Sequence, residues 1–298
     1  GATGSASDYY SDNSNRQLDI TFDVYGPVKV SKPHYYYGNR SAGAAEVLSE
    51  ACKLLDAEID FSQYDTDNDG IVDNIFYFWA GYGEADSGDP NDLWPCSWNL
   101  MQAKDTLLCD GKYIGGFACS NELRTNDNDA SAVPTGIGTF VHEFGHVLGL
   151  PDMYDTQYNM LSFTSGYVDL MDKGSYANDS RTPPNLSGYE RCVLGWATPK
   201  VLDMQADSVL TLKPVISGDV LQIKTKNPDE NFFLENRQLE GWDKYLPLHG
   251  MLAWHVDYDS LAFHNNVLNC DYTHPRYDLV AADGKRNSAT LSGDAFPG

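Results

Sequence analysis

The sequence predicts an α+β fold in which a domain of helices and strands is followed by a mostly β extension. Two observations carry this prediction. Apolar residues recur at helical spacing in residues 41–58 and again in 134–149, with a short aromatic run between them at 75–83. In the last third of the chain, apolar and polar residues instead alternate at the period of strands. We therefore expect two domains, residues 1–196 and residues 197–298.

The first part of the chain is expected to lead into a sheet with a helix behind it. Residues 1–15 are small and polar, which is typical of an exposed lead-in, and residues 18–30 are rich in β-branched side chains, which favours a strand. The helix over 41–58 has Ser41 as a candidate N-cap. The run at 75–83, IFYFWAGYG, is short, aromatic and ended by glycine, as in a buried strand.

The second part of the chain contains two more predicted helices and a series of strands. KYIGGFACS at 112–120 is a candidate strand, the helix over 134–149 ends at Gly149, and residues 186–196 form a short helix. Four later segments alternate at strand period: SVLTLKPV, DVLQIKTK, NFFLENRQ and GMLAWHVDY.

The charge of the chain excludes several classes of partner. Lys and Arg number 20 and Asp and Glu number 43 among 298 residues, so the net charge is -23. This balance repels nucleic acids and anionic membranes. No apolar run reaches the roughly 20 residues of a membrane span. Residue 1 is Gly, with no basic and apolar leader behind it, so we expect that a signal peptide or pro-segment could lie outside this sequence, and the abrupt end at GDAFPG leads us to expect further C-terminal domains.

The six cysteines include no C-x-x-C pair, which argues against a cysteine zinc ribbon. Six cysteines permit up to three disulfides and require none, and Cys109 and Cys119, which flank the turn-like DGKYIGG, are the first pair to test. Cys52 lies on the predicted helix and is expected to be a buried free thiol.

HEFGHVLGLPD, residues 142–152, carries the chemistry. His142 and His146 are four residues apart, so on a helix their Cβ atoms lie about 5–6 Å apart on one face, where both imidazoles can bind one zinc ion. Glu143 is then placed to take a proton from water. Two histidines can also be ordinary core or surface residues, but here the helix has an apolar face to bury.

A third ligand is expected to follow the end of this helix. Gly149 permits the left-handed backbone that ends a helix and turns the chain back. Asp152 comes ten residues after His142, and a carboxylate can complete a zinc site with two histidines while leaving the fourth position open. The pattern therefore predicts the zinc ligands His142, His146 and Asp152.

The motif HExxHxxGxxD, followed by MYD, resembles the immune inhibitor A family of secreted bacterial metallopeptidases, relatives of the metzincins. Further stretches carry the same resemblance across nearly the whole chain, namely DTDNDGIVDNIFYFWAGYGE, DLMDKGSY, FLENRQLEGWDKYLP and GMLAWHVDYD. It implies a zincin-like catalytic domain, with a twisted mixed sheet, a backing helix and an active-site helix. It also implies zinc-dependent cleavage of proteins or peptides outside the cell or at its surface.

The resemblance also assigns roles to further residues. Met171 in DLMDKG would be the methionine of a turn beneath the metal, although a plain core methionine fits the residue type equally well. Tyr176 is a candidate to stabilise the oxyanion. Asp155 lies three residues after Asp152 and is an alternative ligand or an outer hydrogen-bond partner.

DTDNDGIVD, residues 65–73, resembles the start of an EF-hand loop and predicts a calcium site. Phe76 stands where an EF-hand has its bidentate Glu, and an apolar strand follows the loop instead of a helix, so we expect a structural ion and no signalling role. The expected ligands are the side chains at loop positions 1, 3, 5 and 9 and the carbonyl at position 7: Asp65, Asp67, Asp69, Asp73 and Ile71.

The function that these motifs favour is a secreted zinc endopeptidase with Glu143 as the general base. Two other classes remain open. One is a calcium-stabilised binding or adhesion module with an inactive or latent zinc site. The other is a zinc amidase that acts on cell-wall material, and a comparison of casein with cell-wall fragments would separate it from a peptidase.

Overall fold

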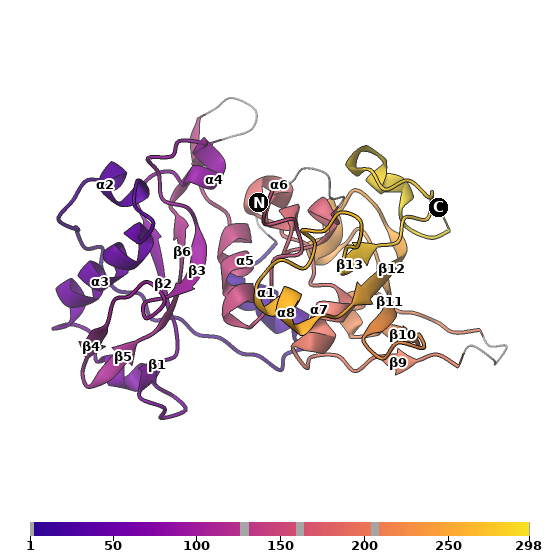
Figure 1. Ribbon diagram of the computed structural model, residues 1–298, viewed down its shortest axis with the longest axis horizontal. Helices are drawn as coiled ribbons and strands as arrows, with labels where there is room; N and C mark the ends of the chain where they lie inside the picture. Colours follow the sequence, from indigo (N-terminus) through magenta and orange to yellow (C-terminus); the bar gives the residue numbers. More distant parts are fainter. Residues whose placement is uncertain (1–2, 126–130, 159–163, 204–208, 298) are drawn as a thin grey trace. The chain divides into compact units, whose positions relative to one another are not determined.

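The computed structural model of the chain describes residues 3–125, 131–158, 164–203 and 209–297. Helices and strands are mixed along these residues, so the predicted α+β class is confirmed. The chain divides into two compact units, one made of Gly1–Ile20 with Gly136–Gly298 and the other of Thr21–Thr135 (Figure 1). Residue 196 lies inside the first unit, and the domain boundary placed there stays a prediction.

The unit Thr21–Thr135 packs short helices against small sheets. Its helices are α2 (His34–Gly38), α3 (Gly43–Leu55) and α4 (Glu84–Ser87). Its strands are β1 (Ile71–Val72), β2 (Ile75–Trp79), β3 (Cys96–Asn99), β4 (Leu107–Cys109), β5 (Lys112–Ile114), β6 (Gly116–Asn121), β7 (Leu123–Thr125) and β8 (Ala132–Pro134). They form sheets in the orders β2-β6-β3, β1-β5-β4 and β7-β8.

The sheet β2-β6-β3 is mixed, because β2 runs parallel to β6 and β3 runs antiparallel to it. The core beside it contains Leu48 of α3 and Phe117 of β6, so the helix predicted over 41–58 packs on strands as expected. Its start differs from the prediction. Ala42, not Ser41, is the N-cap, and it makes no side-chain capping bond.

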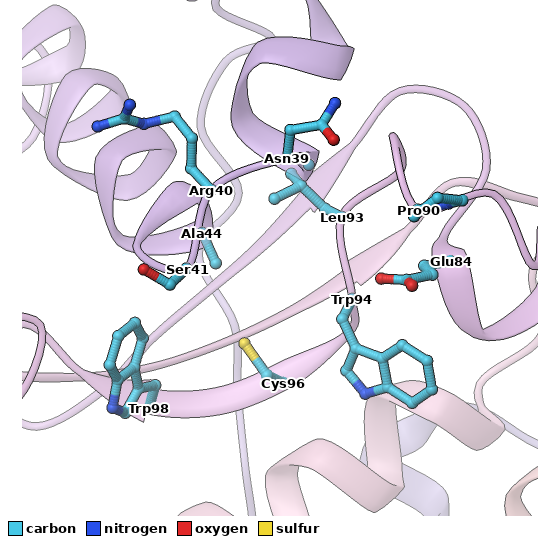
Figure 2. A pocket seen from close by; sticks show the side chains of 11 residues that line it. Asn39, Arg40, Ser41, Ala44, Glu84, Pro90, Leu93, Trp94, Cys96 and Trp98 are labelled. Carbon is cyan, nitrogen blue, oxygen red and sulfur yellow. The ribbon is translucent and has the colours of Figure 1, made fainter.

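A pocket of about 410 Å³ lies in this unit (Figure 2). Figure 2 shows Cys96 between Trp94 and Trp98, and all three residues line the pocket. No predicted metal-site residue lines it.

The predicted pairing of Cys109 with Cys119 is wrong, because Cys119 lies opposite Cys96 on the neighbouring strand, with 3.7 Å between the sulfur atoms. None of the six cysteines takes part in a disulfide among the described residues, and Cys52 is buried as predicted.

The other unit contains five helices and one five-stranded sheet in its described residues. Its helices are α1 (Ala6–Asn13), α5 (Gly138–Val147), α6 (Ala177–Ser180), α7 (Gly188–Val193) and α8 (Ser260–His264). Its strands are β9 (Lys200–Val201), β10 (Leu221–Lys224), β11 (Glu230–Arg237), β12 (Gly250–Asp257) and β13 (Tyr277–Leu279). The strand order is β13-β12-β11-β10-β9. The neighbouring pairs β10–β11, β11–β12 and β12–β13 are antiparallel.

Two expectations for the N-terminal part of the chain are wrong. The lead-in forms helix α1, because Ser5 and Asp8 make a reciprocal capping box and Tyr9 and Tyr10 bury an apolar face. Residues 18–30 form no strand, and residues 21–29 are exposed. Strand propensity is effective only where a neighbouring strand pairs with the segment and a core covers one face.

The four predicted strands of the last third have different outcomes. The segments at 219–226, 231–238 and 250–258 coincide with β10, β11 and β12, as predicted. The described part of 208–215 contains no strand and makes only an isolated bridge, Pro214 to Asn236.

A buried ionic cluster joins β11 to the segments around it. The Arg237 guanidinium donates to Glu235 at 2.7 Å, to Asp243 at 2.8 Å and to the Asn185 carbonyl at 2.9 Å. Arg237 and Glu235 are fully buried, so each charge depends on its partners for compensation.

Arg237→Ala is expected to lower the free energy of unfolding by about 3–5 kcal/mol, because it leaves buried carboxylates without their cation. Urea unfolding measures this loss. Arg286→Ala is the matched control: its salt bridge with Asp278 is 44% exposed on the arginine side, so the expected loss is below about 1 kcal/mol. Equal losses in the two variants would contradict the account.

Candidate metal centre

Helix α5 carries both histidines of HEFGH and is fixed at its start by close backbone packing. A Cβ on Gly138 would lie 1.8 Å from the Ser175 carbonyl oxygen, so only glycine permits this approach. Helix α1 contacts α5 (Figure 1), and the Tyr10 hydroxyl donates to the Val141 carbonyl at 2.5 Å. These contacts set the position of the next residue, His142.

The end of α5 turns the chain back toward the histidines. Gly149 has φ +99°, a conformation that other residues adopt only under strain. Its N–H donates to the His146 carbonyl at 2.9 Å, and the Leu150 N–H donates to Gly145 at 3.0 Å. This pair of bonds is the Schellman motif, and it ends the helix as the sequence predicts.

Three donor atoms meet after this turn. Asp152 Oδ1 lies 3.2 Å from His142 Nε2 and 3.3 Å from His146 Nε2. Oδ1 is buried and accepts no well-aligned hydrogen bond from the described residues. All the candidate ligand atoms lie within 4.8 Å of one another. Two imidazoles and one carboxylate oxygen are a donor set that suits zinc.

Backbone carbonyls orient both imidazole rings. His142 Nδ1 lies 2.9 Å from the Leu170 carbonyl oxygen and His146 Nδ1 lies 2.8 Å from the Leu150 carbonyl oxygen. A carbonyl can only accept, so each Nδ1 carries a proton, and the neutral form of each ring presents the lone pair of Nε2 to the shared site. The residues therefore fit a metal ion.

The electrostatics of the site follow from its burial. Burial lowers the pKa of His142, but the carboxylates of Asp152 and Glu143 outweigh burial and raise it to about 9. Burial alone would raise the pKa of Asp152, yet the two imidazoles hold it well below the usual range. Burial raises the pKa of Glu143, and the imidazoles only partly offset this rise.

Met171 lies against the helix between its two histidines. A Cβ on Gly145 would be 2.7 Å from Met171 Sδ, and Met171 is fully buried. The Met171 N–H donates to Asp169 Oδ1 at 2.7 Å, and the Tyr277 hydroxyl of β13 donates to Asp169 Oδ2 at 2.7 Å. Burial raises the pKa of Asp169 to about 6, although the bond from Tyr277 lowers it.

The other predicted residues occupy different positions. Tyr176 is half-buried at the end of the 3-10 helix Lys173–Tyr176, which contacts α5. Asp155 is buried and accepts from the Gln157 N–H at 3.0 Å. Among the described residues, it is not part of the cluster of possible metal ligands that His142, His146 and Asp152 form. The geometry thus brings Asp152, not Asp155, to His142 and His146.

Two further residues lie near the site, and nothing in the sequence pattern indicates that they belong to it. Burial raises the pKa of Tyr154, and the charges of Asp152 and Glu143 raise it further, so this tyrosine lies within the electrostatic reach of both. Asn266 hydrogen-bonds to Asp152 although it is 114 residues away in the chain. Neither residue belongs to a recognisable spacing.

The acidic loop forms a second cluster, in the unit Thr21–Thr135. Asp65, Asp67 and Asp73 each offer a carboxylate oxygen within 4.8 Å of the others. Asp69 instead accepts from the Ile71 N–H at 2.8 Å. Asp65 also contacts the Lys112 ammonium at 2.5 Å, which lowers the pKa of this carboxyl group. Three of the four predicted carboxylate ligands of calcium therefore converge, and Asp69 is not in the group.

Comparison with known proteins adds a family to this geometry. The model of a family described as immune inhibitor A peptidase M6, catalytic domain, matches residues 2–195. The chain is 29% identical over 198 residues to the pre-pro-metalloprotease PrtV of Vibrio cholerae serotype O1, covering 57% of this chain and 21% of that protein. It is 26% identical over 191 residues to immune inhibitor A of Bacillus thuringiensis subsp. alesti, covering 55% and 27%. The chain thus spans only about a quarter of the length of these relatives.

The contact between Gly145 and Met171 is testable by a double-mutant cycle. Gly145→Ala forces a methyl group against the methionine, whereas in a Met171→Ala background the same change gains helix propensity without the clash. We expect the two effects on unfolding free energy to differ by about 0.5–3 kcal/mol. Equal effects in both backgrounds would show that Met171 does not pack against this helix.

Proposed function

Because this chain belongs to the immune inhibitor A family of M6 metallopeptidases, we propose that it is a secreted zinc endopeptidase that cleaves proteins outside the cell. The observation that carries the proposal is the convergence of His142, His146 and Asp152 on one buried point. These residues would hold the zinc ion. When bound, zinc polarises a carbonyl group and lowers the pKa of water from about 15.7 to about 7.

Glu143 is the general base in this proposal. It follows the first ligand on α5 and is 6% exposed, and burial raises the pKa of its carboxyl group. A carboxylate of raised basicity takes the proton of the attacking water and then delivers it to the leaving amine. Its burial also keeps bulk water from competing for that proton.

The supporting residues have more limited roles. Met171 packs against Gly145 of α5 and would hold the helix in position beneath the metal. Tyr176 is retained as the candidate oxyanion donor on the strength of the family resemblance, since the 3-10 helix that carries it contacts α5. A role for Tyr176 would appear as a loss of turnover in Tyr176→Phe.

The rest of the functional assignment is also a proposal. We assign residues 1–196 to a zincin-like catalytic domain and 197–298 to a β extension packed on it. The family match ends at residue 195, which supports this division. The relative in Vibrio is named a pre-pro-metalloprotease, which supports secretion and a pro-segment for the full protein here. No helix among the described residues is long and apolar enough to cross a membrane.

Peptidase activity is tested with casein and zinc. The zinc-loaded chain is expected to cleave casein, chelation is expected to abolish cleavage, and zinc is expected to restore it. Glu143→Gln keeps the shape of the side chain and removes its basicity, so cleavage should fall about 10²–10⁴-fold while zinc content stays equal.

The control reactions separate the other functional classes. Cleavage of peptidoglycan fragments with no cleavage of casein would favour an amidase. If the chain held one zinc per molecule and cleaved neither substrate, peptidase activity of this chain would be refuted and a binding role would gain weight. Glu58→Gln, an exposed change of the same type, should cleave casein like the parent.

We also propose a structural calcium ion at the acidic loop. The carboxylates of Asp65, Asp67 and Asp73 lie close together, and Lys112 provides the cation that the described structure places beside them. Calcium would offset the repulsion more completely and fix the connection from Tyr64 to β1. Its ligands would be oxygen atoms, as calcium requires.

Calcium is expected to raise the thermal unfolding midpoint of the metal-free chain. A ligand present at 100 times its Kd stabilises a protein by about 2.7 kcal/mol. Asp67→Asn and Asp73→Asn should each weaken the calcium response, whereas Glu58→Gln should leave it unchanged. A midpoint that does not respond to calcium in the parent would refute the calcium site.

A further inference from the structure

The carboxylate of Asp152 is held from the far side by Asn266. The Asp152 N–H donates to Asn266 Oδ1 at 2.7 Å, and Asn266 Nδ2 donates to Asp152 Oδ2 at 2.6 Å. One carboxamide therefore binds both the backbone and the side chain of the same residue. Two such bonds fix the rotation of the aspartate side chain as well as its position.

This double contact determines which oxygen faces the histidines. Oδ2 is engaged by Asn266, whereas Oδ1 is buried, accepts no well-aligned bond from the described residues and points at the two Nε2 atoms. A freely rotating carboxylate would present either oxygen and would lose that freedom on binding a metal. The Asn266 contact restricts the rotation before the metal binds.

Asn266 is itself held in place by its surroundings. Thr156 Oγ1 donates to the Asn266 carbonyl at 2.6 Å. Nearby, Asn269 Nδ2 donates to the Met153 carbonyl at 2.8 Å, and its Oδ1 accepts from the Tyr277 N–H at 3.1 Å. The segment after α8 is therefore tied both to the loop that carries Asp152 and to strand β13.

Backbone geometry explains part of the choice of asparagine, but not its side-chain contacts. Asn266 has φ +56° two residues after the end of α8, and asparagine or glycine is favoured at such a position. Glycine would satisfy the backbone alone. Only a side chain with one acceptor and one donor can bind the N–H and the carboxylate of Asp152 together.

We propose that Asn266 is a positioning residue for the third zinc ligand, and that the chain beyond residue 195 therefore completes the metal site. The family match ends at residue 195, so the role comes from outside the matched region. The inference rests on the proposed zinc site. Asn266 acts through Asp152 and does not itself coordinate the metal.

The test is the zinc affinity of the purified chain, measured by competition with a chromophoric chelator. Asn266→Gly keeps the favoured backbone conformation and removes the carboxamide, and Asn266→Asp replaces the donor with a repelling oxygen. Loss of an outer hydrogen-bond partner typically weakens metal binding about 10–100-fold, and we expect this loss in both variants. Asn265→Ala, an exposed neighbour with ordinary backbone, should stay within about twofold of the parent.

Cobalt substitution supplies a readout that a purely structural role would not change. The visible absorption of bound Co²⁺ reports ligand geometry, so it should change in Asn266→Gly and not in Asn265→Ala. Tight zinc binding in the parent with unchanged affinity and an unchanged cobalt spectrum in Asn266→Gly would overturn the positioning role alone. A parent that binds no zinc would overturn the proposed function as well, so the two failures are distinguishable.

Discussion

The contact of one aspartate oxygen with two imidazoles is the constraint on which the rest of this site depends. Asp152 Oδ1 is buried within 3.3 Å of both Nε2 atoms, and a buried carboxylate is stable only when cations or a metal compensate it. Helix α5 must therefore end after Val147, and the chain must turn back so that Asp152 reaches the two histidines. The left-handed Gly149 and the Schellman bonds produce this turn, and the Leu150 carbonyl of the turn also orients His146.

The support of the site extends well beyond the motif. Leu170 orients His142 and Met171 packs against Gly145, so one turn of chain holds both the ring and the helix. That turn is held in its own right by the buried Asp169, which accepts from Tyr277 of β13. With Asn266 on Asp152, residues from the last third of the chain contact both of the loops that surround the proposed metal. The β-rich last third of the chain therefore supports the site by contacts with these two loops.

Local chemistry explains which features the sequence could predict. A helix that carries two histidines four residues apart, and a glycine that ends it, depend only on neighbouring residues, and the structure has both. The strand expected at 18–30 fails because strands need partners, which no local pattern contains. Helix α1 was missed although its Ser5 and Asp8 form a capping box, because the polar composition around them obscured that signal.

Features that depend on distant contacts could not be predicted in this way. Cys119 faces Cys96 because of the order of strands in a sheet, whereas closeness in sequence favoured Cys109. Asn266 and Tyr277 reach the site over 114 and 108 residues from the groups they bind, and an isolated asparagine or tyrosine carries no spacing that reveals such a role. The tertiary structure alone determines these contacts.

X-ray absorption spectroscopy of the zinc-loaded chain, compared with Asp152→Ala, would identify the ligands of the proposed zinc ion. If His142, His146 and Asp152 hold the ion, the zinc has a first shell of nitrogen and oxygen atoms, with scattering from two imidazole rings and bond lengths of about 2.0–2.2 Å. The variant is expected to lose one oxygen ligand while the scattering from both imidazole rings remains. A shell that contains sulfur, a single imidazole, or a spectrum unchanged by Asp152→Ala would contradict this ligand set.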